Sequence, residues 1–187
     1  MPRHADPELE PKLLDAAQKL WRAGGDRALS MRALARAAKT NTPAIYRRFR
    51  NRKDILRALM LRFRNQYVES IRAAQSLEDS VEAYIDVALK QPREYELYFS
   101  ESTLRPPESR TPEIGPGFIW AQQKCAERFG GSPQDHAPLV LAIWALAHGT
   151  VAFLNSKALP PQRGEQLRAA CRDAVAKLLC SQEQARK

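Results

Sequence analysis

The chain has 187 residues, of which 44 % are apolar and only 8 are glycine, so it is globular rather than fibrous or disordered and fits one or two domains. Its net charge is +9, and residues 1–64 hold 16 Lys and Arg against 6 Asp and Glu, while the rest is nearly neutral. Such localised positive charge indicates a polyanionic partner, and three cysteines without metal-ligand spacing exclude a disulfide framework.

The sequence shows no sign of a targeting or membrane segment. The first residues, MPRHADPELEP, lack the apolar core of a signal peptide. The longest apolar run, Leu139–Ala147, is too short to cross a bilayer. We therefore expect a cytoplasmic protein with no membrane partner.

Apolar residues at helical spacing predict a first helix over Pro7–Ala23, which Gly24 and Gly25 end. We expect this helix to pack behind the next two helices, with Trp21 in the core. Its basic side chains either touch phosphate or form a solvated face: Lys12, Lys19 and Arg22.

The segment Ser30–Asp54 predicts two short helices joined by a tight turn. Ser30 is a good N-cap for the first helix, whose apolar residues repeat at i, i+3 and i+4. Polar residues at Lys39–Asn41 then break the pattern. The segment therefore has the organisation of a helix-turn-helix.

The second of these helices is predicted from about Thr42 to Phe49. Pro43 lies near its start, where a missing N–H group is no loss. The N-cap is either Asn41 or Thr42, because a residue before proline is biased away from the helical conformation. Ile45 and Phe49 form its buried stripe, while its other faces are basic and hydroxyl-rich. Such a helix suits the major groove of DNA.

This segment resembles the helix-turn-helix of the TetR family of transcriptional regulators. In that family the recognition helix ends in Tyr, one or two basic or aromatic residues and Phe, and a small cap and a basic residue open the next helix. The matching positions here are Tyr46, Arg47, Arg48, Phe49, Asn51 and Arg52, with Ile55 as the next apolar residue. The family usually has Gly where this chain has Lys39. Because Gly tolerates a positive φ, Lys39 implies either strain or an altered turn.

We predict a DNA interface in which Tyr46, Arg48 and Arg52 bind phosphates and so position the protein without reading sequence. The candidates for reading bases are Lys39, Thr40, Asn41, Thr42 and Arg47. Ser30 and Pro43 complete the expected interface. The alternative is a merely solvated basic face, and the concentration of charge in residues 1–64 argues against it.

The rest of the chain predicts six more helices and one long irregular segment, Thr103–Gly117. The helices run from Asn51 or Arg52 to about Gln75, from the Ser76 cap to about Gln91, from Pro92 over REYELYFSES, over Phe118–Phe129, from Pro133 or Asp135 to about Lys157, and over Gly164–Ser181. No strand pattern occurs, so the predicted fold class is all-α. A helix-turn-helix domain of residues 1–52 precedes a larger helical domain of residues 53–187.

Aromatic residues of the larger domain fit either a ligand pocket or an ordinary core. Seven candidates for ligand binding are Phe63, Tyr67, Tyr95, Phe99, Trp120, Trp144 and His148. His148 lies alone on an apolar helix. It is either a core side chain with a satisfied hydrogen bond or the polar anchor of a pocket.

The helix containing LVLAIWALAHGTVAFL is apolar on nearly every face, which is typical of a helix buried all round. In a chain this small, that pattern favours burial by a second copy of the protein. The last helix carries a stripe that we assign to the dimer interface: Leu167, Cys171, Ala174, Val175, Leu178 and Leu179. Two final helices of this kind suit a four-helix dimer interface.

The run Trp144–Gly149 and the Tyr- and Phe-rich helix after Pro92 also resemble the TetR C-terminal domain named for its Trp-His-Gly signature. This resemblance implies a helical ligand-binding and dimerisation domain, with no particular ligand. We therefore expect a homodimeric transcriptional regulator that acts as a repressor and binds a palindromic operator in double-stranded DNA. An apolar or amphipathic small-molecule effector would shift the Arg52–Gln75 helix and release the DNA.

Two alternatives remain open. A DNA-binding regulator without a small-molecule effector would carry the same helix-turn-helix, and the apolar second domain argues against it only weakly. A helical enzyme is disfavoured, because His4, His136 and His148 have no partner at ligand or catalytic spacing and the sequence has no Gly-rich phosphate loop. We expect no catalytic residue, no cofactor and no metal.

Overall fold

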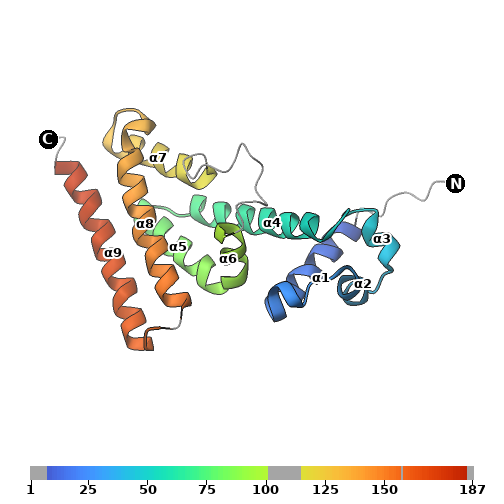
Figure 1. The fold of residues 1–187 in the computed structure, drawn as a ribbon. Coiled ribbons are helices and arrows are strands. Elements are labelled where there is room, and N and C mark those ends of the chain that lie inside the picture. Colours follow the sequence, from blue (N-terminus) through green and yellow to red (C-terminus); the bar gives the residue numbers. More distant parts are fainter. Residues whose placement is uncertain (1–7, 101–114, 157, 185–187) are drawn as a thin grey trace. The chain divides into compact units, whose positions relative to one another are not determined.

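The structure is a computed structural model that describes residues 8–100, 115–156 and 158–184, and the elements in those ranges are all helices (Figure 1). The predicted all-α fold class is confirmed. Residues 8–64 and 93–100 form one compact unit, and the other described residues form a second. This division by packing differs from the predicted domains, 1–52 and 53–187, which stay a prediction about function.

The first unit is built around a core that five helices share. Its elements are α1 (Leu9–Gly24), the short 3-10 helix η1 (Gly25–Arg27), α2 (Met31–Ala37), α3 (Thr42–Tyr46), the first part of α4 (Arg52–Arg72) and α6 (Pro92–Ser100). Leu13, Leu34 and Ile45 are fully buried in this core. Leu97 brings α6 into the same cluster at 3 % exposure. A helix distant in sequence therefore completes the core beneath α2 and α3.

The helix α3 is shorter than the predicted Thr42–Phe49 helix, because it ends at Tyr46. The amides of Arg48 and Phe49 both donate to the carbonyl of Ile45 at 2.9 Å, which tightens the chain into a turn. This turn carries Phe49 back into the core, where it is 5 % exposed. The two apolar residues are thus buried together, as their spacing predicts, without one continuous helix.

The second unit contains the end of α4 together with the remaining elements. These are α5 (Leu77–Lys90), α7 (Pro116–Phe129), the 3-10 helix η5 (Pro133–His136), α8 (Ala137–Asn155) and α9 (Pro161–Gln184). The helix α8 packs on α5 and on α9, beside which it lies in Figure 1. Most of the irregular segment predicted at Thr103–Gly117 lies outside the described residues. Its last two residues start α7, two residues earlier than predicted.

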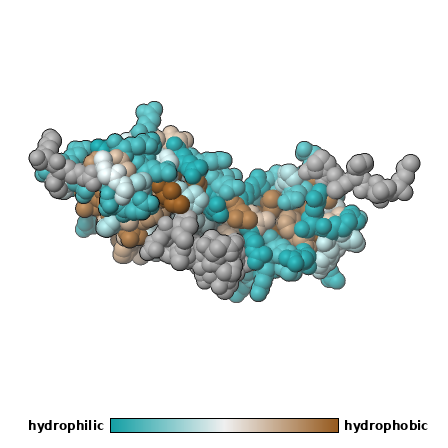
Figure 2. Space-filling view, turned by 90° about the horizontal axis from the view of Figure 1, so that it is seen from above, coloured by the Kyte–Doolittle hydropathy of each residue, from teal (hydrophilic) through white to brown (hydrophobic). Residues whose placement is uncertain are grey.

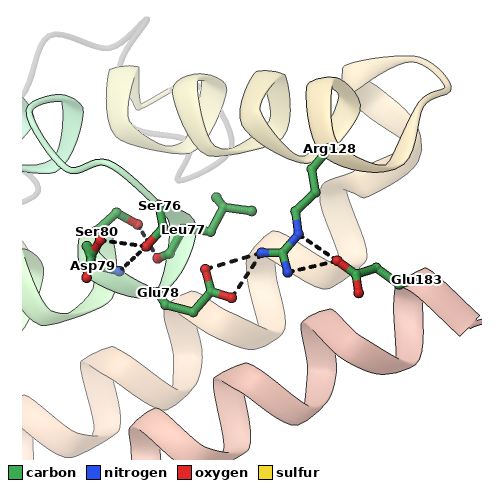
Figure 3. Close-up of polar contacts among 7 residues, drawn as sticks. All are labelled: Ser76, Leu77, Glu78, Asp79, Ser80, Arg128 and Glu183. Atoms are coloured by element: carbon green, nitrogen blue, oxygen red, sulfur yellow. Dashed lines mark hydrogen bonds and ion pairs between the residues drawn. The ribbon is translucent and has the colours of Figure 1, made fainter.

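Arginines fasten α7 and α9 to an acidic face of α5. Arg128 of α7 donates to Glu78 of α5 at 2.9 Å and to Glu183 of α9 at 2.8 Å, so one side chain joins three helices (Figure 3). Another arginine ties α9 to α5 through two carboxylates, at 2.5 and 2.6 Å: Arg168 with Glu82 and Asp86. These contacts fix the end of the chain within its own unit.

The helix α8 is apolar far beyond the run Leu139–Ala147. Together with η5 it forms the continuous helix Pro133–Asn155. By length and composition alone this helix could cross a membrane, but core helices of soluble proteins pass the same test. Only 22 % of its most apolar window is buried within the protomer. Leu141, Leu146 and Phe153 are 36, 37 and 57 % exposed. In the view of Figure 2, by contrast, hydrophilic residues cover most of the surface. The described residues of the second unit therefore do not bury α8 on all sides, and its full burial stays a prediction.

Lys39 ends α2 in a conformation that lysine rarely adopts. Its φ is 52°, and within the described residues no other residue except glycine has a positive φ. The amide of Thr40 donates to the carbonyl of Ala35 at 2.9 Å, and that of Lys39 to the carbonyl of Arg36 at 3.2 Å, which is the bond pattern of a Schellman turn. Lys39 thus occupies the position that glycine usually takes. Of the two alternatives, strain rather than an altered turn is correct.

We expect Lys39→Gly to raise the free energy of unfolding by about 1 kcal/mol, because left-handed backbone costs an L-residue roughly that much. Lys39→Ala is the matched control, since it removes the charge but keeps the Cβ atom and so keeps the strain. Urea denaturation of the three proteins measures the difference. Equal stability of the Gly and Ala variants would contradict a strained turn.

Candidate nucleic-acid interface

Side-chain caps place the two short helices of the first unit. The Ser30 hydroxyl accepts from the amide of Ala33 at 3.1 Å, which confirms Ser30 as the N-cap of α2. The Asn41 Oδ1 atom accepts from the amide of Ala44 at 2.9 Å, so Asn41 rather than Thr42 is the N-cap of α3. This fixes the register of α3, which the sequence left open by one residue.

The helix α3 has one buried and one exposed face. Ala44 and Ile45 are 4 and 0 % exposed, and they anchor α3 to the core. Tyr46, which follows directly, is 54 % exposed although it is a large aromatic residue. Of the ten predicted interface residues, six are exposed: Ser30, Lys39, Asn41, Pro43, Tyr46 and Arg47. The other four are partly buried: Thr40, Thr42, Arg48 and Arg52. The α2–α3 segment thus presents a polar and basic surface on a buried apolar base.

Arg52 differs from the other interface candidates because its guanidinium binds the protein itself. Its Nε atom donates to the carbonyl of Leu29 at 2.8 Å. Its Nη2 atom donates to the carbonyl of Asp26 at 3.0 Å and to the carboxylate of the same residue. Arg52 therefore holds the η1 loop that leads into α2. Its contact with phosphate stays a prediction.

Two exposed basic residues lie next to the predicted interface but are not among its ten candidates, although Arg50 belongs to the basic face that the sequence predicts. Arg50 has a side chain that is 86 % exposed and pairs with Asp54 at 3.2 Å, and Lys53 is exposed in the first turn of α4. By contrast, the predicted phosphate ligand Arg48 is 27 % exposed and lies 3.7 Å from Glu10. The only sequence signal for Lys53 is the charge excess itself, which does not say which basic side chains point outward.

The aromatic ligand candidates fall into separate groups. In the first unit, Tyr95 lies 6.5 Å from Phe63 and 4.6 Å from Phe99, centroid to centroid. Tyr67, Trp120, Trp144 and His148 belong to the second unit. The predicted set is therefore not one cluster within either unit.

In the second unit a chain of contacts links α4, α5 and α8. The ring of Tyr67 lies 5.3 Å from that of Tyr84, whose hydroxyl is 3.1 Å from His148 Nδ1, and the His148 ring is 5.6 Å from Trp144. Desolvation by burial lowers the pKa of His148, which favours the neutral form of its ring. Tyr84 is not among the seven ligand candidates that the sequence offers. We call these four residues the aromatic cluster.

The predicted dimer stripe on α9 is largely used within the protomer. Cys171, Val175 and Leu179 are 4, 1 and 0 % exposed. The other three members are only partly buried: Leu167, Ala174 and Leu178. Three exposed apolar side chains of the same unit lie instead on α8, whereas α9 turns its most apolar face toward its own unit.

Groups suited to catalysis or metal binding are scarce in the described part of the chain. No cluster of three or more His, Cys, Asp or Glu residues there could hold a metal ion. The buried His136 ring bonds the carbonyl of Gly130 through Nε2 at 2.8 Å, which joins the turn between α7 and α8. Burial raises the pKa of the Cys125 thiol to about 11, so it is not a nucleophile at neutral pH.

Comparison with known families gives two matches. Residues 13–59 match the family described as bacterial regulatory proteins, tetR family. Residues 77–178, more than half of the chain, match the family described as tetracyclin repressor-like, C-terminal domain. No curated protein matches the sequence. The predicted Trp-His-Gly type of the C-terminal domain stays a prediction.

Solved structures share the fold over nearly the whole chain. A TetR-family transcriptional regulator from Streptomyces coelicolor has a TM-score of 0.61 at 22 % identity, with 92 % of this chain and 98 % of that one covered. TetR from Acinetobacter baumannii AYE has a TM-score of 0.62 at 19 % identity, with 93 and 96 % covered. The multidrug binding protein EbrR, complexed with imidazole, has a TM-score of 0.64 at 19 % identity, with 95 and 93 % covered.

We expect Tyr46→Phe to weaken DNA binding about fivefold, because it removes one hydrogen bond to phosphate and leaves the ring in place. Stability should not change, since the side chain is largely exposed. Tyr84→Phe makes the same chemical change in the second unit and, in the absence of an effector, should leave DNA affinity unaltered. Fluorescence anisotropy with labelled DNA measures both. An unchanged affinity for Tyr46→Phe would remove Tyr46 from the interface.

Proposed function

This chain belongs to the tetR family of bacterial regulatory proteins, and from that premise we propose that it is a homodimeric repressor which a small ligand releases from its operator. It is a DNA-binding transcriptional regulator of helix-turn-helix type. The observation that carries the proposal is the exposure of Tyr46 and Arg47 on a segment whose opposite face is buried. A large aromatic side chain is held in solvent there, beside basic residues.

In this proposal α3 enters the major groove of double-stranded DNA. Asn41, Thr42 and Pro43 lie at its N-terminal end, where a recognition helix contacts base edges. Tyr46 and Arg47 follow one turn later and reach toward phosphates and bases. The excess of positive charge in residues 1–64 adds attraction to the DNA backbone that does not depend on sequence.

The exposed face of α8 supports the homodimer. Leu141, Leu146 and Phe153 lie on it, and a Cβ atom added at Gly149 would meet nothing within 4 Å. A helix of this kind needs an apolar cover, and a second copy of the same helix supplies one around a two-fold axis. Two-fold symmetry then makes the operator an approximate palindrome. We propose that α9 flanks this contact rather than forming its centre.

The effector is proposed to be an apolar or amphipathic small molecule that binds near the aromatic cluster. The relative EbrR was solved with imidazole, and a variant of TetR from Acinetobacter baumannii AYE was solved with minocycline. The cluster supplies aromatic surface and one neutral polar pair, Tyr84 and His148. Such a site suits an uncharged ring system better than a carboxylate. The ligand releases DNA only to the extent that it binds the released state more tightly.

A regulator without an effector is the alternative, and ligand titration separates the two. Trp144 lies in the aromatic cluster and Trp120 on α7 of the same unit, so binding there should change their fluorescence. A titration in which fluorescence changes and DNA is released supports the effector. We propose no catalytic activity, and we place the protein in the cytoplasm, without a membrane partner.

Selection of bound sequences from random DNA should yield a palindromic consensus, because two copies of α3 would read the two half-sites. Binding to that consensus should weaken steeply between low and physiological salt, since phosphate contacts release counterions. Anisotropy at several salt concentrations measures the slope. A consensus without two-fold symmetry, or an affinity that salt does not change, would contradict the proposal.

We expect Leu146→Glu to convert the protein to a monomer, because it places a charge in the apolar face of α8. Ile119→Glu is the matched control, since Ile119 is an equally exposed apolar residue, 41 % against 37 %, on α7. Light scattering during sizing chromatography gives the molar mass of each. A dimer for Leu146→Glu, or a monomer for both variants, would exclude α8 as the centre of the interface.

A further inference from the structure

We propose that α6 takes part in DNA binding through its buried residue Glu94. Glu94 positions α1, and through α1 it positions α2 and α3 of the first unit. The inference rests on the proposed function and adds a residue to it. Glu94 lies about forty positions beyond the helix-turn-helix in the sequence, yet it packs into the first unit.

Three residues on one face of α1 bind the first turn of α6. The carboxylate of Glu94 accepts from Arg22 Nε at 2.5 Å and from Gln18 Nε2 at 3.2 Å. The indole N–H group of Trp21 donates to the backbone carbonyl of Arg93 at 3.2 Å. The last two turns of α1 are therefore bonded to α6 in addition to packing on η1 and α2, their neighbours in sequence.

The loop after α1 is shaped by the same contact. Gly25 has a φ of 59°, and a Cβ atom there would lie 2.6 Å from Arg93 Nη1. Arg52 holds the following residues, Asp26 and Leu29, from the side of α4. This loop leads directly into α2, so a displacement of α6 reaches the helix-turn-helix through it.

Glu94 is a charged group in an apolar setting, and its partners are few. Its side chain is 2 % exposed, whereas that of Arg22 is 48 % exposed. Its second oxygen, Oε2, is buried and finds no hydrogen-bond partner among the described residues. A buried carboxylate of this kind depends on the partner that compensates its charge. Moving α6 away from α1 would therefore leave the buried carboxylate of Glu94 without the charge that compensates it.

The chain links this contact to the aromatic cluster. The helix α5, which carries Tyr84, ends at Lys90, and only Gln91 separates it from α6. Glu94 follows three residues later, in the first turn of α6. A shift of α5 caused by a ligand therefore passes along a short, mostly helical segment to the residue that holds α1.

The test compares two glutamates on the same helix. Glu94→Gln should weaken operator binding about tenfold, a typical size for coupling between sites. Glu96→Gln removes the same charge from an exposed position of α6. Loss of a negative charge by itself favours DNA binding, so this control should bind equally well or slightly better. Weaker binding by Glu94→Gln together with equal or stronger binding by Glu96→Gln would show that Glu94 acts by positioning α1 and not by its charge alone.

Together with Glu94→Gln, the variant Arg22→Gln and the double variant Arg22→Gln/Glu94→Gln form a double-mutant cycle. The double variant should lose no more affinity than the larger of the single losses, because both remove one contact. Circular dichroism confirms that the variants tested are folded. If Glu94→Gln does not fold, Arg22→Lys decides in its place, since it keeps the positive charge and removes the Nε–H donor that binds Glu94. Folded Glu94→Gln or Arg22→Gln with the affinity of the original protein would overturn the proposal.

A measurement without DNA distinguishes this proposal from the proposed function. Amide hydrogen exchange over residues 18–30 should be faster in Glu94→Gln than in Glu96→Gln, because α1 and its loop lose their anchor. Equal exchange rates would overturn the positioning role even for a protein that binds DNA. A protein whose exchange responds as expected, but which selects no DNA sequence, would instead disprove the proposed function alone.

Discussion

The burial of α1 in the core of the first unit is the constraint on which the DNA-binding surface depends. Leu13 and Ala17 of α1 are fully buried in one cluster with residues of α2, α3 and α4. A helix of five residues, such as α3, has no stability of its own, because helix nucleation is unfavourable and the segment is too short to repay it. The position of α3 is therefore the position that packing gives it.

The same constraint explains why charged residues of one segment have different roles. Arg47 and Arg52 lie five residues apart and carry the same group. Arg47 is exposed in the turn after α3, whereas the guanidinium of Arg52 donates hydrogen bonds to Asp26 and Leu29. The first is proposed to contact DNA, and the second shapes the loop that leads into α2. Lys39 adds a third role, since it accepts an unfavourable backbone conformation to complete the turn.

Apolar surface is distributed as unevenly as charge. The first unit buries most of its large apolar side chains in one core, with Leu61 as an exception at 37 % exposure, and α9 turns Cys171, Val175 and Leu179 inward. The helix α8 instead leaves Leu146 and Phe153 in solvent. This contrast within one unit supports the proposal that α8, rather than α9, meets the second copy of the chain. Charge pairs such as Arg128 with Glu78 and Glu183 hold the helices around it (Figure 3).

The sequence by itself determined the elements and the kind of surface, because helical periodicity, N-caps and charge density are local properties. Ser30 as a cap, the helix after Pro92 and the unusual turn at Lys39 could all be predicted in this way. Tertiary structure decided which side chains are available, since that depends on residues far apart in the chain. Only packing could place Glu94 beside Arg22, turn Arg52 inward and bury the stripe of α9, because no local pattern records which face meets which neighbour.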